Sequence, residues 1–164
     1  MSTTDTDLPG SRFGQKLDRV TVERRDVPGL TEPPGYRHYA VASGTTRLVF
    51  TAGAVPLDPT GRLVGPDDYR AQTDQVLANL LAALEAAGAS PEQVVKTTVY
   101  VVGEGREPKV AVWDVVQRSE LDAAPSTLVG VAGLGYSGQL VEIDAVAVID
   151  DAGKSPPPSR MPPP

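Results

Sequence analysis

The clearest hydrophobic pattern in the chain is a run near its C-terminal end, residues 140–149, Leu-Val-Glu-Ile-Asp-Ala-Val-Ala-Val-Ile. Side chains on a β-strand point alternately to opposite faces, so this run predicts a strand with one wholly apolar face. That face is predicted to belong to the core and consists of Val141, Ile143, Ala145, Ala147 and Ile149. The opposite face carries Glu142 and Asp144, about 7 Å apart along the strand at ~3.3 Å per residue.

These two carboxylates admit two interpretations. A carboxylate among apolar neighbours is costly unless it is solvated, paired or used in chemistry. Glu142 and Asp144 could therefore form an ordinary solvent-facing strand surface, or one of them could serve a site. The rest of the chain has to decide between these interpretations.

Two further segments show the periodicity of helices. Between residues 67 and 87 apolar side chains recur at spacings of three and four and predict one buried stripe, Val76, Leu77, Leu80, Leu81 and Leu84. Gly88 follows as a C-terminal cap, and Ser90-Pro-Glu-Gln93 has the spacing of a capping box that begins a short helical turn. A second helix is predicted over 109–121, with Val112, Trp113 and Val116 as its buried face.

The remaining strands are predicted from shorter patterns. Residues 19–23 alternate as an edge strand, and 36–41 and 48–55 are predicted to pair as a hairpin across the turn at 44–47. Residues 94–102 form a β-branched strand, and 125–131 a strand that precedes the one at 140–149. Gly53 within a strand pattern predicts either a bulge or a close approach to the backbone.

The order β-β-α-β-α-β-β predicts an α+β fold in which a mixed sheet carries both helices on one face. Leu128 and Val146 are expected to leave the other sheet face apolar. An uncovered apolar sheet face predicts a partner, and therefore a homo-oligomer.

Composition adds limits to this prediction. We expect a disordered leader over 1–18, one domain over 19–150 and a proline-rich disordered tail over 151–164, either simply solvated or a ligand for a proline-binding module. A net charge of −6 disfavours nucleic-acid binding, and no apolar run approaches the ~18 residues of a membrane span. The chain has no cysteine, which excludes disulfides. We expect a cytoplasmic protein, because the polar N-terminal segment does not have the pattern of a signal peptide.

Few residues suggest conventional catalysis. His38 is the single histidine, no metal-spaced cluster appears, and no glycine-rich phosphate motif is present. The scattered polar or strand-interrupting positions, each with an ordinary structural explanation of its own, are Tyr36, His38, Gly53, Asn79, Ser126, Thr127, Glu142 and Asp144.

Seven short segments in order collect most of these positions into one family pattern. They are Gly35-Tyr-Arg-His38, Val49-Phe-Thr-Ala-Gly53, Gln75-Val-Leu-Ala-Asn79-Leu, Leu84-Glu-Ala-Ala-Gly88-Ala, Val94-Val-Lys-Thr-Thr-Val-Tyr-Val101, Pro125-Ser-Thr-Leu-Val-Gly-Val131 and Val141-Glu-Ile-Asp-Ala145. Residues 20–149 thereby resemble the Rid (YjgF/YER057c/UK114) family. The resemblance implies a chorismate-mutase-like α+β fold and a homotrimer whose sheets form an inner barrel, with ligand clefts between subunits.

The resemblance also implies a chemistry. The archetypal members hydrolyse reactive enamines and imines such as 2-aminoacrylate without a cofactor. Their water-positioning glutamate matches Glu142, and the tyrosine and strand glycine of their cleft match Tyr36 and Gly53. Their carboxylate-binding arginine has no match, because Ser126 stands at that position beside Thr127. A serine hydroxyl cannot replace a planar charged fork, so 2-aminoacrylate is not the expected substrate.

Two functions follow as hypotheses. The first is a cofactor-free hydrolase of a small imine or enamine, with Glu142 as catalytic residue and with Tyr36, His38, Gly53, Ser126 and Thr127 binding substrate. The second is a small-molecule-binding or regulatory trimer that has lost the chemistry. An endoribonuclease, as some relatives are described, fits the acidic charge poorly.

Overall fold

A computed structural model describes residues 20–31, 35–44 and 46–150. The predicted leader over 1–18 and tail over 151–164 lie outside the described residues. The elements are β1 Thr21–Arg25, β2 Tyr39–Ser43, β3 Thr46–Phe50, α1 Tyr69–Ala86, the 3₁₀ turn η1 Pro91–Gln93, β4 Val94–Val102, α2 Glu107–Val116, β5 Ser126–Val131 and β6 Val141–Asp150. Within the described part of the chain, neither α-helix is long and apolar enough to cross a membrane.

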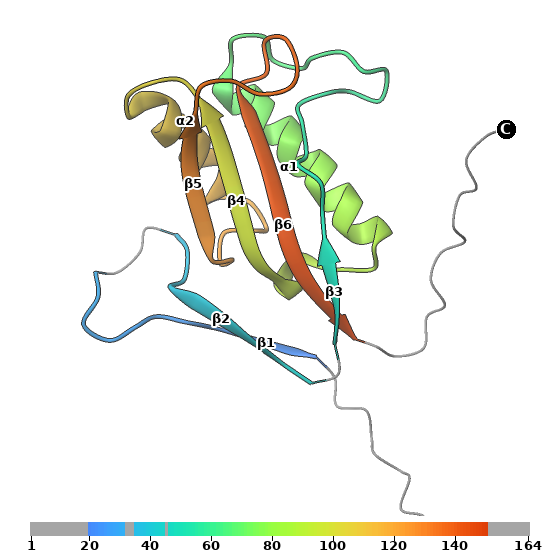
Figure 1. Ribbon diagram of the computed structural model, residues 1–164, viewed down its shortest axis with the longest axis vertical. Helices are drawn as coiled ribbons and strands as arrows, with labels where there is room; N and C mark the ends of the chain where they lie inside the picture. Colours follow the sequence, from blue (N-terminus) through green and yellow to red (C-terminus); the bar gives the residue numbers. More distant parts are fainter. Residues whose placement is uncertain (1–19, 32–34, 45, 151–164) are drawn as a thin grey trace, which may run out of the picture.

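A four-stranded sheet in the order β3-β6-β4-β5 forms the body of the protein. β6 pairs antiparallel with β3 and with β4, and β5 pairs parallel with β4 after the crossover through α2. Figure 1 shows both helices behind this sheet and the β1–β2 ribbon lying across its lower end. The predicted α+β fold with two helices on one sheet face is confirmed.

The core lies between the sheet and the helices. The inner face of β6 is buried along its whole length, as the alternating pattern predicts. It packs with the inner residues of β4 against the apolar stripe of α1 and against α2. Val76, Leu77, Leu80 and Leu84 of the predicted stripe are buried, and Leu81 is half-buried.

The ends of α1 follow from local chemistry. The Asp68 carboxylate accepts the backbone N–H groups of Arg70 at 2.9 Å and Ala71 at 3.1 Å, which satisfies two donors of the first turn. At the other end Gly88 has a φ of +79° and donates its N–H to the carbonyl of Glu85. This left-handed residue stops the helix, as predicted.

Arg24 of β1 is one side chain that attaches the β1–β2 ribbon to the body, beside a hydrogen bond from the N–H of Val20 to the Asp150 carboxylate. The Arg24 guanidinium donates to the backbone carbonyls of Glu92 at 2.7 Å and Val94 at 2.9 Å. Burial lowers the pKa of Arg24, and the nearby Glu92 charge opposes that effect. This attachment places the loop that follows β1, with Tyr36, beside α2.

Three sequence predictions are corrected. The hairpin over 36–55 does not form, because β2 pairs with β1 while β3 finds a longer-range partner in β6. The second helix covers 107–116 rather than 109–121. It ends early because the Ser119 hydroxyl donates to the carbonyl of Val116 and accepts the N–H of Leu121, which replaces the next helical hydrogen bonds.

The third correction concerns the outer sheet face. Leu128 lies opposite the fully buried Val99 and therefore points toward the helices. The outer face is nevertheless apolar at one edge, where Leu48 is 58% and Phe50 is 70% exposed. Phe50 lies opposite Val146 in the register, so the exposed apolar patch is centred on β3 and β6.

Leu80→Ala should lower the free energy of unfolding by roughly 2–5 kcal/mol, because it removes a fully buried side chain between helix and sheet. Chemical denaturation checks this value. Glu85→Ala, at an exposed position of the same helix, is the matched control and should change stability by less than about 0.5 kcal/mol. Equal losses for the two variants would contradict the assignment of the core.

Candidate functional site

Gly53 lies in a β-bulge at the end of β3. The N–H groups of Thr51 and Ala54 donate to the carbonyls of Ala145 at 3.0 Å and Ile143 at 2.8 Å. Two residues of the β3 segment therefore face one residue of β6, which defines the bulge. Both features predicted for Gly53, a bulge and a close approach, are present.

The group that approaches Gly53 is the carboxylate of Glu142. A Cβ atom added to Gly53 would lie 1.9 Å from Glu142 Oε1, so only glycine leaves room for the carboxylate there. On its other side Glu142 Oε2 accepts a hydrogen bond from Gln139 Nε2 at 3.0 Å. Gln139 is itself buried, with 4% of its surface exposed. Glu142 is thus a half-buried carboxylate held between a glycine backbone and a buried amide.

Two polar residues of α1 hold the segments on either side of this carboxylate. Asn79 Nδ2 donates to the carbonyls of Val55 at 2.8 Å and Leu57 at 2.9 Å, just after the bulge. The fully buried Gln72 donates to the carbonyl of Gly138 at 2.9 Å and accepts the N–H of Leu140 at 2.8 Å, just before β6. Sequence analysis missed Gln72 and Gln139, although a glutamine at the start of an apolar helical stripe could have indicated Gln72.

The outer sheet face also carries a polar cluster next to Glu142. The Tyr100 hydroxyl donates to the Asp144 carboxylate at 2.9 Å, and this hydrogen bond, together with burial, raises the pKa of Tyr100. The Lys96 ammonium donates to the Thr127 hydroxyl, and burial lowers the pKa of Lys96. Thr127 therefore lies on the same sheet face as Glu142 and Asp144.

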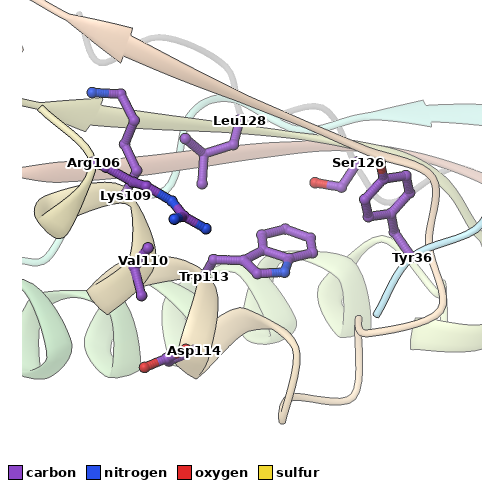
Figure 2. Close-up of a pocket in the computed structure, with 8 residues that line it drawn as sticks. All are labelled: Tyr36, Arg106, Lys109, Val110, Trp113, Asp114, Ser126 and Leu128. Carbon is purple, nitrogen blue, oxygen red and sulfur yellow. The ribbon is translucent and has the colours of Figure 1, made fainter. Parts of the chain in front are cut away.

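A cavity of about 460 Å³ lies on the opposite, helix-covered side, between α2 and the edge strand β5. Figure 2 shows its lining, which is Tyr36, Arg106, Lys109, Val110, Trp113, Asp114, Ser126 and Leu128. The rings of Tyr36 and Trp113 meet edge to face, with centroids 5.9 Å apart and planes at 80°. The cavity therefore has an aromatic end near Tyr36 and a cationic end near the start of α2.

Ser126 brings a hydroxyl group into this cavity. It lies opposite Thr97 in the parallel register, and its Oγ accepts a hydrogen bond from Thr97 Oγ1 at 2.9 Å. A hydroxyl has one proton to donate, so this arrangement leaves the Ser126 proton available to a ligand. Ser126 is uncharged, and no other residue of β5 brings a charge to this side of the sheet.

His38 lies outside the group of residues that line the cavity. Its Nδ1 is 3.2 Å from the backbone nitrogen of Val27, which donates to it, and 3.3 Å from a carboxylate oxygen of Asp26. The imidazole thus joins the two ends of the loop between β1 and β2. Its role in binding substrate stays a prediction.

The predicted site residues fall into two groups within one chain. Glu142, Gly53 and Thr127 belong to the outer sheet face, whereas Tyr36 and Ser126 line the cavity on the helix side. Adjacent residues of a strand point to opposite faces, so Ser126 and Thr127 cannot both face one ligand from a single chain. Sequence analysis placed Trp113 in the core and did not single out Arg106 or Lys109, whose positions depend on how α2 packs beside β5.

The sequence profile of the family described as Endoribonuclease L-PSP matches residues 30–149, which is well over half of the chain. The chain belongs to this family. A RutC family protein of Synechocystis is 38% identical to it over 118 residues, covering 71% of this chain and 88% of that protein.

Solved structures of the Rid family share the fold. A Rid protein of Yersinia pestis, YyfB, has a TM-score of 0.63 and 34% identity, covering 77% of this chain and 98% of that one. The YjgF protein of Escherichia coli has a TM-score of 0.54 and 31% identity, covering 76% and 92%. An Escherichia coli protein named 2-iminobutanoate/2-iminopropanoate deaminase is 44% identical over 82 residues, which span 49% of this chain and 59% of that protein. The resemblance to the Rid family stated from the sequence is confirmed.

Gly53→Ala should displace the Glu142 carboxylate and lower the free energy of unfolding by about 1–3 kcal/mol, as overpacking does. The same change in a Glu142→Ala background should be nearly neutral, because the opposing oxygen atoms are gone. Thermal and chemical denaturation of the four proteins of this cycle measure the coupling. Gly133→Ala is the control, since an added Cβ there meets no atom within 4 Å. If the stability changes of the two substitutions were additive, the close approach of Glu142 to Gly53 would be contradicted.

Proposed function

We propose that this Rid-family protein is a cofactor-free hydrolase that deaminates a small reactive imine or enamine. The observation that carries the proposal is the Glu142 carboxylate, which is half-buried, oriented by Gln139 and seated where only glycine leaves space. A carboxylate with no function would not require a buried amide and a bulge to hold it in one position. The relative named as an iminobutanoate deaminase supports the reaction class.

The proposed reaction needs one base and one water molecule. Glu142 accepts a proton from water as the oxygen attacks the carbon of the protonated imine, and the C=N π electrons move to nitrogen to give a neutral carbinolamine. Glu142 then gives this proton to the nitrogen and takes the hydroxyl proton as the C=O bond forms and the C–N bond breaks. Ammonia and a carbonyl compound leave, and Glu142 returns the hydroxyl proton to solvent. An enamine substrate first takes a proton at carbon to become the imine. No step changes an oxidation state, so no cofactor is required.

The division of site residues between two sheet faces supports a site built from two subunits. Within the proposal, the outer face of one chain, with Glu142 and Gly53, meets the Tyr36–Ser126 cavity of the next chain in a homotrimer. The exposed Leu48 and Phe50 supply the apolar surface that such an interface needs. No nucleic acid or membrane has a role in this proposal.

The alternative is a small-molecule-binding or regulatory trimer without turnover. The serine at the position of the archetypal carboxylate-binding arginine is the observation that favours it. A ribonuclease, which the description of the family suggests, is less well supported, because the net charge of −6 opposes binding to a polyanion.

Glu142→Gln should lower ammonia release from amino-acid-derived imines by at least about 100-fold, since general base catalysis contributes that much or more. The melting temperature should be equal or higher, because the change removes the need to keep a half-buried carboxylate charged. Imines are generated in situ by an amino-acid oxidase, and ammonia is followed by a coupled assay.

Asp144→Asn is the matched control for this test. Asp144 is a second carboxylate two residues along the same strand face, but it is bonded to Tyr100 rather than poised beside Gly53. Its substitution should leave turnover within a few-fold of the wild type. Full activity in Glu142→Gln would remove Glu142 from the mechanism, whereas ligand binding without turnover in the wild type would establish the alternative.

A further inference from the structure

One cation of the helix-side cavity, Arg106, has no partner among the described residues. Within the described part of the chain, no hydrogen bond or ion pair engages the guanidinium of Arg106, which is exposed at the start of α2. In the view of Figure 2 this guanidinium points along the cavity toward Trp113 rather than away from it. A charged group aimed into a cavity without a counter-ion is a candidate receptor for an anionic ligand.

The other charged groups of the cavity are already engaged. The Lys109 ammonium donates to the backbone carbonyl of Gly105 at 2.7 Å and lies 3.3 Å from that of Gly103. Asp114, the carboxylate in the lining, is bound by the Arg70 guanidinium at 2.8 Å. Asp114 therefore does not neutralise Arg106, and the cavity keeps a positive end in a protein whose net charge is −6.

The remaining lining suits the rest of a small organic acid. Trp113, Leu128 and Val110 supply an apolar wall, and the ring of Tyr36 closes the far end against Trp113. The Ser126 hydroxyl, which keeps a proton to donate, is the polar group on the β5 side. A volume of about 460 Å³ is well above that of a three-carbon acid and falls in the ordinary range for small-molecule sites.

We propose that Arg106 is the anion-binding residue of this cavity and that its ligand is a 2-imino acid with an apolar side chain. The inference rests on the proposed function and names the residue that binds the carboxylate of its substrate. The carboxylate is held from the helix by Arg106 instead of from β5, where Ser126 leaves no charge. The apolar side chain lies along Trp113 and Leu128, and the imine carbon is left facing the entrance of the cavity.

The test uses binding as well as turnover. Trp113 is the single tryptophan of the chain, so its fluorescence reports ligands in this cavity directly. The probe is 4-methyl-2-oxopentanoate, the stable 2-oxo acid that hydrolysis of such an imine would release, and its methyl ester is the uncharged comparison. The full-length protein is titrated with each compound at low and high salt.

Arg106→Ala should weaken binding of the acid at least about tenfold, the loss expected for a hydrogen-bonded charge pair, and leave the weak binding of the ester unchanged. Ser126→Arg in the Arg106→Ala background should restore binding of the acid, because it returns a guanidinium to the cavity from β5. Arg118→Ala removes an exposed arginine that follows the same helix outside the cavity lining, and it should bind like the wild type.

Equal binding of the acid by wild type and Arg106→Ala, equal binding of acid and ester by the wild type, or no binding of either compound would overturn the inference. Its failure is distinguishable from that of the proposed function. Arg106-dependent binding of the acid without ammonia release from the matching imine would uphold the site and refute the hydrolase. Ammonia release that is unchanged in Arg106→Ala would uphold the hydrolase and refute the site.

Discussion

The covering of one sheet face by both helices is the constraint on which the rest of the structure depends. Because strand side chains alternate, burying Val141, Ile143 and Ala145 against α1 forces Glu142 and Asp144 onto the opposite face. The same rule sends Ser126 toward the helices and Thr127 away from them. The core therefore determines which polar groups can share a ligand and which cannot.

Two amide side chains of α1, the buried Gln72 and the half-buried Asn79, serve this arrangement. Gln72 and Asn79 face the sheet from α1 and bind the backbone on either side of Glu142, so the helix that supplies the core also fixes the carboxylate. Removal of either amide would leave partly buried carbonyl groups without these donors, which is costly. Stability and proposed chemistry thus depend on the same packing of α1 against β6.

Local patterns predicted much of this structure. The alternation of 140–149 and the stripe of α1 were sufficient for the core, and the glycine in a strand correctly indicated the bulge beside Glu142. Partners far apart in sequence were not predictable: β3 pairs with β6 rather than with β2. The sequence did not show which side chains of β5 face the helices, because Leu128 and Val129 are both apolar. Arg106 lies in a short glycine-containing connection whose sequence has no periodic pattern, so its position could not be predicted.

The central claim is that one site combines Glu142 of one subunit with the cavity of another, and mixed oligomers test it most directly. Glu142→Gln and Arg106→Ala proteins, each with low activity, are denatured together and refolded as an equal mixture. With random assembly, a site receives an intact Glu142 with probability one half and an intact Arg106 with probability one half. About one quarter of the sites should therefore be complete, and ammonia release should recover to about one quarter of the wild-type rate. A mixture no more active than the average of its two components would contradict the account.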